Sequence, residues 1–135
     1  MSTVQVTHRY AFSPEAVFDA WLAPATARRF LFATPEGTMV RAEVDARVGG
    51  RFTFTDRRPP MAGFEAGDVD HVGEYLEIDR PRRLVFTFTV PKYSQDLTTV
   101  TLDIAPDGAG CILILTHEGV AEEWAKQTTQ GWTGI

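Results

Sequence analysis

The sequence predicts an α+β fold, in which two short helices and a curved antiparallel sheet of seven strands form separate parts of one domain, residues 1–135. Two observations support this prediction. Alternation of apolar and polar residues, which is typical of half-buried strands, recurs seven times, whereas helical spacing is confined to the segment after the first strand and to the last residues. Most strand-like runs are also joined by short turns, so neighbouring strands are expected to be antiparallel.

The first strand is predicted at residues 4–12, where Val, His, Tyr and Phe alternate with more polar residues. Ser13 and Pro14 end this strand and begin a helix, residues 14–22. A serine hydroxyl can accept a hydrogen bond from the first helical turn, and proline at the first helical position has no N–H to leave unpaired. The next proline interrupts this helix and begins a second short one, residues 24–31.

The remaining strands are predicted from alternation and from the turn residues between them. Residues 57–70 are instead rich in Pro and Gly without a clear period, which predicts a long loop that could gate an opening. Leu84, Phe86 and Phe88 share one face of their strand, so the sheet has an apolar face directed at a dry interior. The six strands are expected at residues 39–48, 50–56, 71–79, 83–90, 96–106 and 111–119.

Composition and charge exclude several classes of protein. The formal net charge of −5 and a pI near 5.1 oppose attraction to phosphate backbones, so nucleic acid is not an expected partner. The sequence has no run of about 18 apolar residues and no basic leader before an apolar block, so we expect no membrane span and a cytoplasmic location. Cys111 is the single cysteine and is expected to pack as a small apolar side chain.

Five segments spread over nearly the whole chain carry a family resemblance: FSPEAVFDAWLAP, DARVGGRFTF, GEYLEIDRPRRLVFTF, TVTLDIAPDGAGCILILTHEG and QGWTGI. With these segments the sequence resembles the activator of Hsp90 ATPase homologue type of the START-like (SRPBCC) superfamily. That superfamily includes lipid carriers, hormone receptors, polyketide cyclases and co-chaperone domains, so the resemblance is more specific for fold than for activity.

The resemblance implies the helix-grip (START/Bet v 1-like) fold, in which the sheet curls around a long C-terminal helix and leaves a cavity for small apolar molecules. Family members continue past the Gly–Trp pair with a long helix, whereas this sequence ends at Ile135, shortly after Trp132. Without that helix the sheet would expose a large apolar patch. We therefore expect either that the sequence stops before most of the grip helix or that a second copy of the chain covers this face, so the protein is a monomer or a homodimer.

His117 is the first candidate for a ligand contact. His8, His71 and His117 show no metal-ligand spacing, so no metal site is expected. Alternation places His117 on the same side of its strand as Cys111, and the family pattern directs that side inward. A histidine there can hydrogen-bond a ligand or act as a general base, or it can simply be paired within the core.

Glu74 and a set of aromatic residues are the other candidates. Glu74 shares a face with Leu76 and Ile78 if alternation is regular, and a carboxylate on the inner face would need a partner such as Arg41 or another arginine on a neighbouring strand. A rim or interstrand ion pair is the interpretation of this glutamate that the sequence favours, and acid–base chemistry is the alternative. Large aromatic groups can pack the core or line a pocket. The aromatic candidates for the pocket are Phe52, Phe54, Phe86, Phe88, Tyr93 and Trp132.

Binding of a small hydrophobic or amphipathic ligand is the function that these observations favour. One alternative is a protein-interaction module that binds an Hsp90-type chaperone. The other is a cyclase- or dehydratase-like enzyme that uses His117 or Glu74 as an acid or base, which the sequence favours less than binding. The sequence contains no phosphate-binding loop or nucleophile elbow, so no cofactor is expected.

Overall fold

The sheet has the strand order β1-β7-β6-β5-β4-β3-β2, and every neighbouring pair is antiparallel. This arrangement comes from a computed structural model, which describes residues 2–27, 38–58, 67–91, 97–121, 125, 128, 129 and 132. The predicted α+β fold with seven antiparallel strands is confirmed. The elements are β1 (Ser2–Tyr10), α1 (Pro14–Leu22), α2 (Pro24–Ala27), β2 (Thr38–Val44), β3 (Arg51–Arg58), β4 (Gly67–Asp79), β5 (Arg83–Phe88), β6 (Thr98–Asp107) and β7 (Gly110–Val120).

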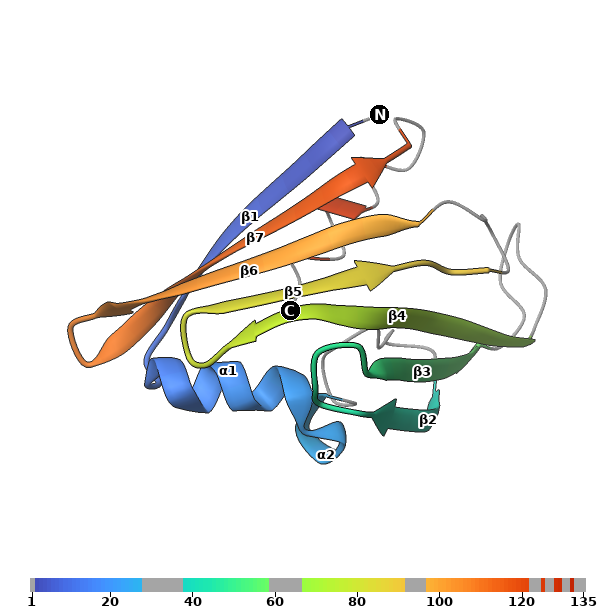
Figure 1. Ribbon diagram of the computed structural model, residues 1–135, viewed down its shortest axis with the longest axis horizontal. Coiled ribbons are helices and arrows are strands. Elements are labelled where there is room, and N and C mark those ends of the chain that lie inside the picture. The colour runs from blue at the N-terminus through green and yellow to red at the C-terminus, as the bar shows by residue number, and fades with distance from the viewer. Residues whose placement is uncertain are drawn as a thin grey trace.

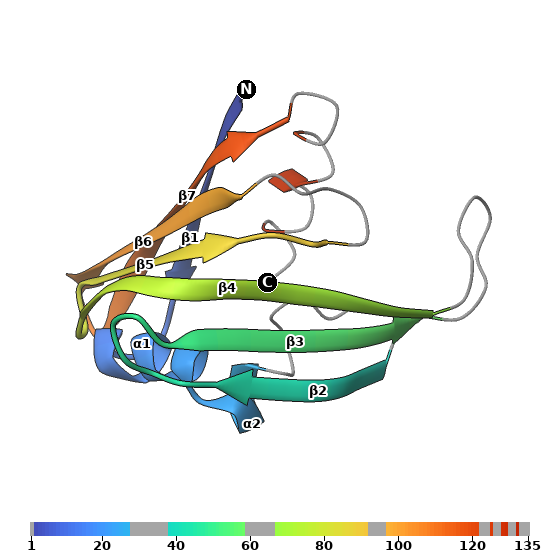
Figure 2. The same ribbon diagram turned by 45° about the vertical axis from the view of Figure 1, so that its right-hand side comes forward.

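The sheet is strongly curved, and both helices lie on its hollow side. Figure 1 shows α1 and α2 beneath the end of the sheet at which β4 turns into β5. Figure 2 shows β1 and β7 rising away from β2 and β3, so that the sheet partly encloses a space. We call the hollow side, on which the helices pack, the inner face, and the opposite side the outer face.

Helix α1 begins where the sequence predicted. The Ser13 hydroxyl accepts a hydrogen bond from the Ala16 N–H at 3.2 Å, and Pro14 occupies the first turn. The buried side of the helix consists of Val17, Phe18 and Trp21. These three apolar side chains hold α1 against the inner face, because removing them from water is the main favourable term in packing.

Several strand boundaries differ from the prediction, and three of them matter most. The strand expected at residues 39–48 ends at Val44, because a turn follows in which the Asp45 carbonyl accepts from the Arg47 N–H at 2.8 Å. β4 begins at Gly67 instead of residue 71 and β3 continues to Arg58, so strand replaces both ends of the loop expected at residues 57–70. These two ends pair with each other in register, which the Pro- and Gly-rich composition concealed.

Some predicted features lie outside the described residues. These are the central part of the predicted loop, residues 59–66, and the last part of the predicted second helix, residues 28–31. In the C-terminal segment, Ala125, Thr128, Thr129 and Trp132 have helical conformation, and the Thr129 hydroxyl donates to the Ala125 carbonyl at 2.9 Å. The described part of this segment is therefore helical, as its sequence suggested.

Candidate functional site

The inner face has an aromatic end, beside α1. Phe52 packs edge-on against Phe86, with ring centroids 5.4 Å apart, and it also contacts Tyr75 at 5.6 Å. A small cavity of about 10 Å³ remains among these rings, and its lining is Trp21, Phe52, Tyr75, Leu84 and Phe86. Ligand pockets have volumes of roughly 300–1,000 Å³, and one water needs about 10–15 Å³. The cavity that these five side chains line is therefore no larger than one water molecule.

The other end of the inner face combines aromatic and polar groups. Phe88, at the end of β5, stacks on the His117 imidazole of β7 with centroids 5.5 Å apart and ring planes 19° from parallel. His71 of β4 meets the same phenyl ring at 6.0 Å. Trp132, from the C-terminal segment, lies edge-on to Phe88 at 6.3 Å. We call Phe88, His71, His117 and Trp132, together with Thr98, the His117 cluster.

A chain of hydrogen bonds runs through the His117 cluster. The Trp132 Nε1–H donates to His117 Nδ1 at 3.1 Å, and His117 Nε2 lies 2.6 Å from Thr98 Oγ1. The Thr98 hydroxyl in turn donates to the Phe88 carbonyl at 2.8 Å. An indole N–H can only donate, so Nδ1 must accept and the proton of a neutral imidazole lies on Nε2. Every donor in this chain therefore meets an acceptor.

The His117 imidazole is neutral at physiological pH. Only 5% of the residue is exposed, and this burial lowers the pKa of His117 from 6.5 to about 4. A second proton would also lie on Nδ1, where it would face the Trp132 N–H, so two donors would meet. Burial and the indole contact therefore favour the same protonation state.

Two further histidine contacts involve backbone carbonyls. His8 Nε2–H on β1 donates to the Trp132 carbonyl at 2.8 Å, so both the ring and the backbone of this tryptophan are bound by histidines. On β4, His71 Nδ1–H donates to the Phe54 carbonyl at 3.3 Å, and His71 is 6% exposed. All three histidines of the sequence therefore make contacts on the inner face.

Comparison with known proteins identifies the family. The model of the family described as "Activator of Hsp90 ATPase homolog 1-like protein" matches residues 11–135. The chain belongs to this family. The family name abbreviates to AHSA1, and its known members include Hsp90 ATPase activator homologues and ligand-binding domains of the SRPBCC type. No curated protein sequence matches the chain with significance.

Several solved structures share the fold of this AHSA1-like domain. Protein CV1439 from Chromobacterium violaceum has a TM-score of 0.84 and 23% identity, over 99% of this chain and 91% of that one. An AHSA1-like protein from Aeromonas hydrophila has a TM-score of 0.79 and 24% identity, over 99% and 86%. PFC0360w from Plasmodium falciparum, titled an HSP90 activator, has a TM-score of 0.71 and 24% identity, over 98% and 89%. At these identities the likeness shows the fold alone.

Glu74 does not lie on the inner face of the AHSA1-like domain, and it forms the interstrand ion pair that the sequence favoured over a buried position. The register of β4 against β5 shifts between Tyr75 and Glu77, which inserts one extra residue and reverses the alternation. Tyr75 is buried, whereas the Glu74 side chain is 41% exposed on the outer face. Its partner is an arginine on the neighbouring strand, as anticipated, but this is Arg51, at 3.9 Å, rather than Arg41.

Other expected and unexpected residues complete the site. Tyr93, a predicted pocket residue, lies outside the described residues. Sequence reasoning missed His71 and Thr98 as site residues, and it missed the burial of Asp56, which is 1% exposed. For Asp56 the signal was available, because it continues the alternation of Phe52 and Phe54. His71 was missed because its partners, Phe54 and Phe88, lie on other strands. Thr98 was missed because its role depends on His117, which is distant in the sequence.

The described part of the chain contains neither a cluster of metal-binding side chains nor a membrane-spanning helix. Within residues 2–27, 38–58, 67–91 and 97–121 and the four described C-terminal positions, no three His, Cys, Asp or Glu side chains gather closely enough to hold a metal ion. None of the described helices has the length and apolar character needed to cross a bilayer.

Proposed function

We propose that this AHSA1-like domain binds a small amphipathic molecule on the inner face of its sheet, at the His117 cluster. One observation carries the proposal: a buried chain of hydrogen bonds through Trp132, His117 and Thr98 lies directly beside the rings of Phe88 and Trp132. Binding sites for small molecules combine large apolar surfaces with a few well-placed polar groups. On the described inner face, this combination occurs where β5 ends, and Trp132 connects it to the aromatic packing near α1 through Trp21.

The same geometry disfavours catalysis by the predicted acid–base residues. Both nitrogens of His117 are engaged, and a pKa of about 4 makes the imidazole a weak base at neutral pH. Glu74 lies on the outer face beside Arg51, away from the cluster. A binding role needs neither group to exchange a proton, so it fits these contacts better than a cyclase or dehydratase role does.

The small cavity near α1 is not the ligand site that we propose. The cavity near α1 is about 10 Å³, less than the volume of any organic ligand. Trp132 is the member of the cluster that does not belong to the sheet, so moving it disturbs no strand pairing. A ligand that takes the place of the Trp132 ring would therefore leave the sheet intact.

Native mass spectrometry and thermal shift assays test the proposal. The purified domain is expected to retain or bind small amphipathic molecules, which raise its melting temperature. Phe88→Leu, which removes the ring face beside His117, should weaken this effect. Leu76→Ala is the matched control, because Leu76 is 46% exposed and lies away from the inner face. The proposal fails if broad panels of lipids, polyketides and flavonoids leave the melting temperature unchanged.

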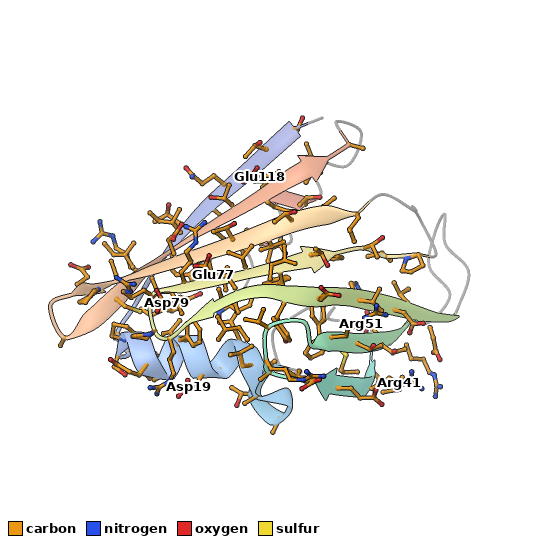
Figure 3. All side chains as sticks on the ribbon, viewed as in Figure 1. Asp19, Arg41, Arg51, Glu77, Asp79 and Glu118 are labelled. Carbon is orange, nitrogen blue, oxygen red and sulfur yellow. The ribbon has the colours of Figure 1, made fainter. Side chains whose placement is uncertain are left out.

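Binding to an Hsp90-type chaperone is a second candidate function, favoured by family membership and by the outer face. The outer face carries a ladder of ion pairs across three adjacent strands: Arg83 lies 3.2 Å from Glu77 and 3.0 Å from Asp103. No described helix covers these strands on that side, as Figure 2 shows. Figure 3 shows Arg41 and Arg51 on β2 and β3, which extend the charged surface. A surface on which both signs of charge alternate can fix the orientation of a partner whose charges complement it.

A pull-down with purified Hsp90 at low and high salt separates the two candidates. If the outer face binds the chaperone, Arg51→Glu should weaken capture at low salt, because the Arg51 side chain is 84% exposed. Phe88→Leu should leave capture unchanged. An absence of capture at low salt removes this candidate without touching the ligand-binding proposal.

A further inference from the structure

The Trp132 side chain is surrounded by residues of the sheet and α1, as a bound ligand would be. Its residue is 5% exposed, and its ring has aromatic neighbours on three elements: Trp21 of α1 at 6.1 Å, Phe88 of β5 at 6.3 Å and His117 of β7 at 6.0 Å. The one polar atom of the ring donates to His117 Nδ1 at 3.1 Å. The space therefore accommodates a planar apolar ring that carries one hydrogen-bond donor.

The tryptophan reaches this space from outside the sheet. Its backbone is bound by His8, whose Nε2–H donates to the Trp132 carbonyl, while Phe88, Thr98 and His117 are fixed in strands β5, β6 and β7. If the segment carrying Trp132 moved, the walls of the space would stay in place, because strand pairing holds them. The space is therefore formed largely by the sheet and α1.

We propose that Trp132 acts as an internal surrogate for a ligand, and that its site takes a planar aromatic molecule bearing one N–H or O–H donor, such as an indole or a phenol. This inference deepens the proposed ligand-binding function and depends on it. The ligand would compete with the Trp132 side chain for this space.

The protonation of His117 determines this preference. Thr98 accepts a hydrogen bond from Nε2–H, and its own hydroxyl donates to the Phe88 carbonyl, so Nδ1 presents a lone pair to the site. A ligand donor satisfies that lone pair, whereas an aromatic molecule without a donor leaves a buried acceptor unpaired. A ligand that can only accept would meet the lone pair unfavourably.

The neighbouring cavity provides additional room. Trp21 contacts Trp132 and also lines the cavity of about 10 Å³ formed with Phe52, Tyr75 and Phe86. Removing the indole of Trp132 would therefore create a space that borders this cavity. The enlarged space would be lined mainly by aromatic rings, with His117 Nδ1 as a polar group, so it should accept a ring of indole size.

Trp132→Ala provides the direct test, with indole and benzothiophene as probes. Benzothiophene has nearly the shape of indole but carries sulfur in place of the N–H. We expect both compounds to raise the melting temperature of the variant, with indole bound about tenfold more tightly, the ratio that one hydrogen bond to a buried acceptor supplies. In the double variant Trp132→Ala, His117→Leu this preference should disappear.

Phe86→Ala is the matched control, because it opens an aromatic-sized space on the same face around a side chain that has no donor. There, indole and benzothiophene should bind alike. Equal affinities at Trp132→Ala, or the same indole preference in both single variants, would overturn the inference.

A second measurement covers the case in which Trp132→Ala does not fold. The indole N–H signals of the unmodified domain are followed by ¹H–¹⁵N NMR while indole is added, and the Trp132 signal is assigned with Trp132→Phe. Displacement predicts that this signal moves toward the position of a solvent-exposed indole, and an unmoved signal at saturating indole contradicts it. If the domain binds other amphipathic molecules while this signal stays fixed, the surrogate role fails and the proposed function stands.

Discussion

The indole N–H of Trp132 donates to Nδ1 of His117 across 3.1 Å, and this contact joins residues from the C-terminal segment and from β7. It fixes the imidazole as the neutral Nε2–H form, which then donates to Thr98 at 2.6 Å. One pair of side chains therefore connects the position of the C-terminal segment to the protonation of a buried histidine. The stability of the domain and the state of the candidate site should change together.

The first prediction concerns pH. The pKa of His117 is about 4 in the folded domain and near 6.5 when unfolded, because burial penalises the charged form. Between these values the unfolded chain binds more protons, so stability is complete above pH 6.5 and is lost as the pH falls toward 4. Chemical denaturation over this range should show a loss of about 3 kcal/mol attributable to this group.

His117→Asn is the control for that prediction. The Asn side-chain oxygen can accept from the Trp132 N–H but does not titrate in this range, so the fall between pH 6.5 and 4 should become shallower. A variant with the same pH dependence as the unmodified domain would show that other groups cause the loss.

The second prediction concerns the Trp132 donor. Trp132→Phe keeps an aromatic ring but removes the N–H, so His117 Nδ1 loses its partner inside the core. We expect a loss of about 1–3 kcal/mol in the free energy of unfolding, measured with urea at pH 7. The pKa of His117 should also rise, because a hydrogen bond that favours the neutral imidazole is gone.

The pKa change distinguishes this role from simple packing. Trp21→Phe removes a similar volume from a residue that packs against Trp132 at 6.1 Å, and it leaves the Nδ1 contact in place. It should destabilise the domain without an upward change in the pKa of His117, read from the imidazole signals in an NMR titration. Equal pKa changes in both variants would assign the effect to packing.

Local patterns predicted much of the architecture and less of the site. Alternation predicted the strands, and with the family resemblance it correctly directed His117 inward. The sequence grouped Glu74 with Ile78 on one face, but a one-residue bulge between Tyr75 and Glu77 puts them on opposite faces. Such a bulge is hard to recognise in an alternating sequence pattern. The contact between Trp132 and His117 could not be predicted, because no local rule links a strand to the segment that follows it.

The third prediction concerns the ion pair between α1 and the β4–β5 turn. Arg80 donates to both carboxylate oxygens of Asp19, at 2.7 and 2.9 Å, and this hydrogen bonding lowers the pKa of Asp19. Both side chains are more than half exposed, so solvent screens the pair. Asp19→Asn should lower the urea midpoint slightly at low salt, and the difference should vanish near about 1 M NaCl.

A double-mutant cycle with Arg80→Gln checks the third prediction. If the pair acts as described, the second substitution adds nothing once the first is made. Because the carboxylate is favoured in the folded state, the contribution is present above the unfolded pKa of Asp19 and is lost as the pH falls through its lowered folded pKa. Full additivity of the two substitutions would mean that the residues act independently.

The fourth prediction concerns Gly73, where β4 and β5 approach each other closely. A Cβ at this position would overlap the Thr87 carbonyl oxygen and lie 2.5 Å from Cε2 of Phe52. A carbonyl within a paired strand cannot move aside as a flexible side chain can, so Gly73→Ala must separate the strands or displace the Phe52 ring beneath them. We expect a loss of about 3 kcal/mol in the free energy of unfolding, by urea denaturation.

Gly108→Ala supplies the comparison that separates a steric clash from backbone strain. Gly108 lies in the β6–β7 turn with φ of +59°, and a Cβ there would meet no atom within 4 Å. Its cost is limited to the left-handed conformation, about 1 kcal/mol. Since Phe52 also lines the small cavity near α1, Gly73→Ala should further change ligand binding if the ring shifts, whereas Gly108→Ala should not. A Gly73→Ala variant no less stable than Gly108→Ala would mean that the two strands can separate at little cost.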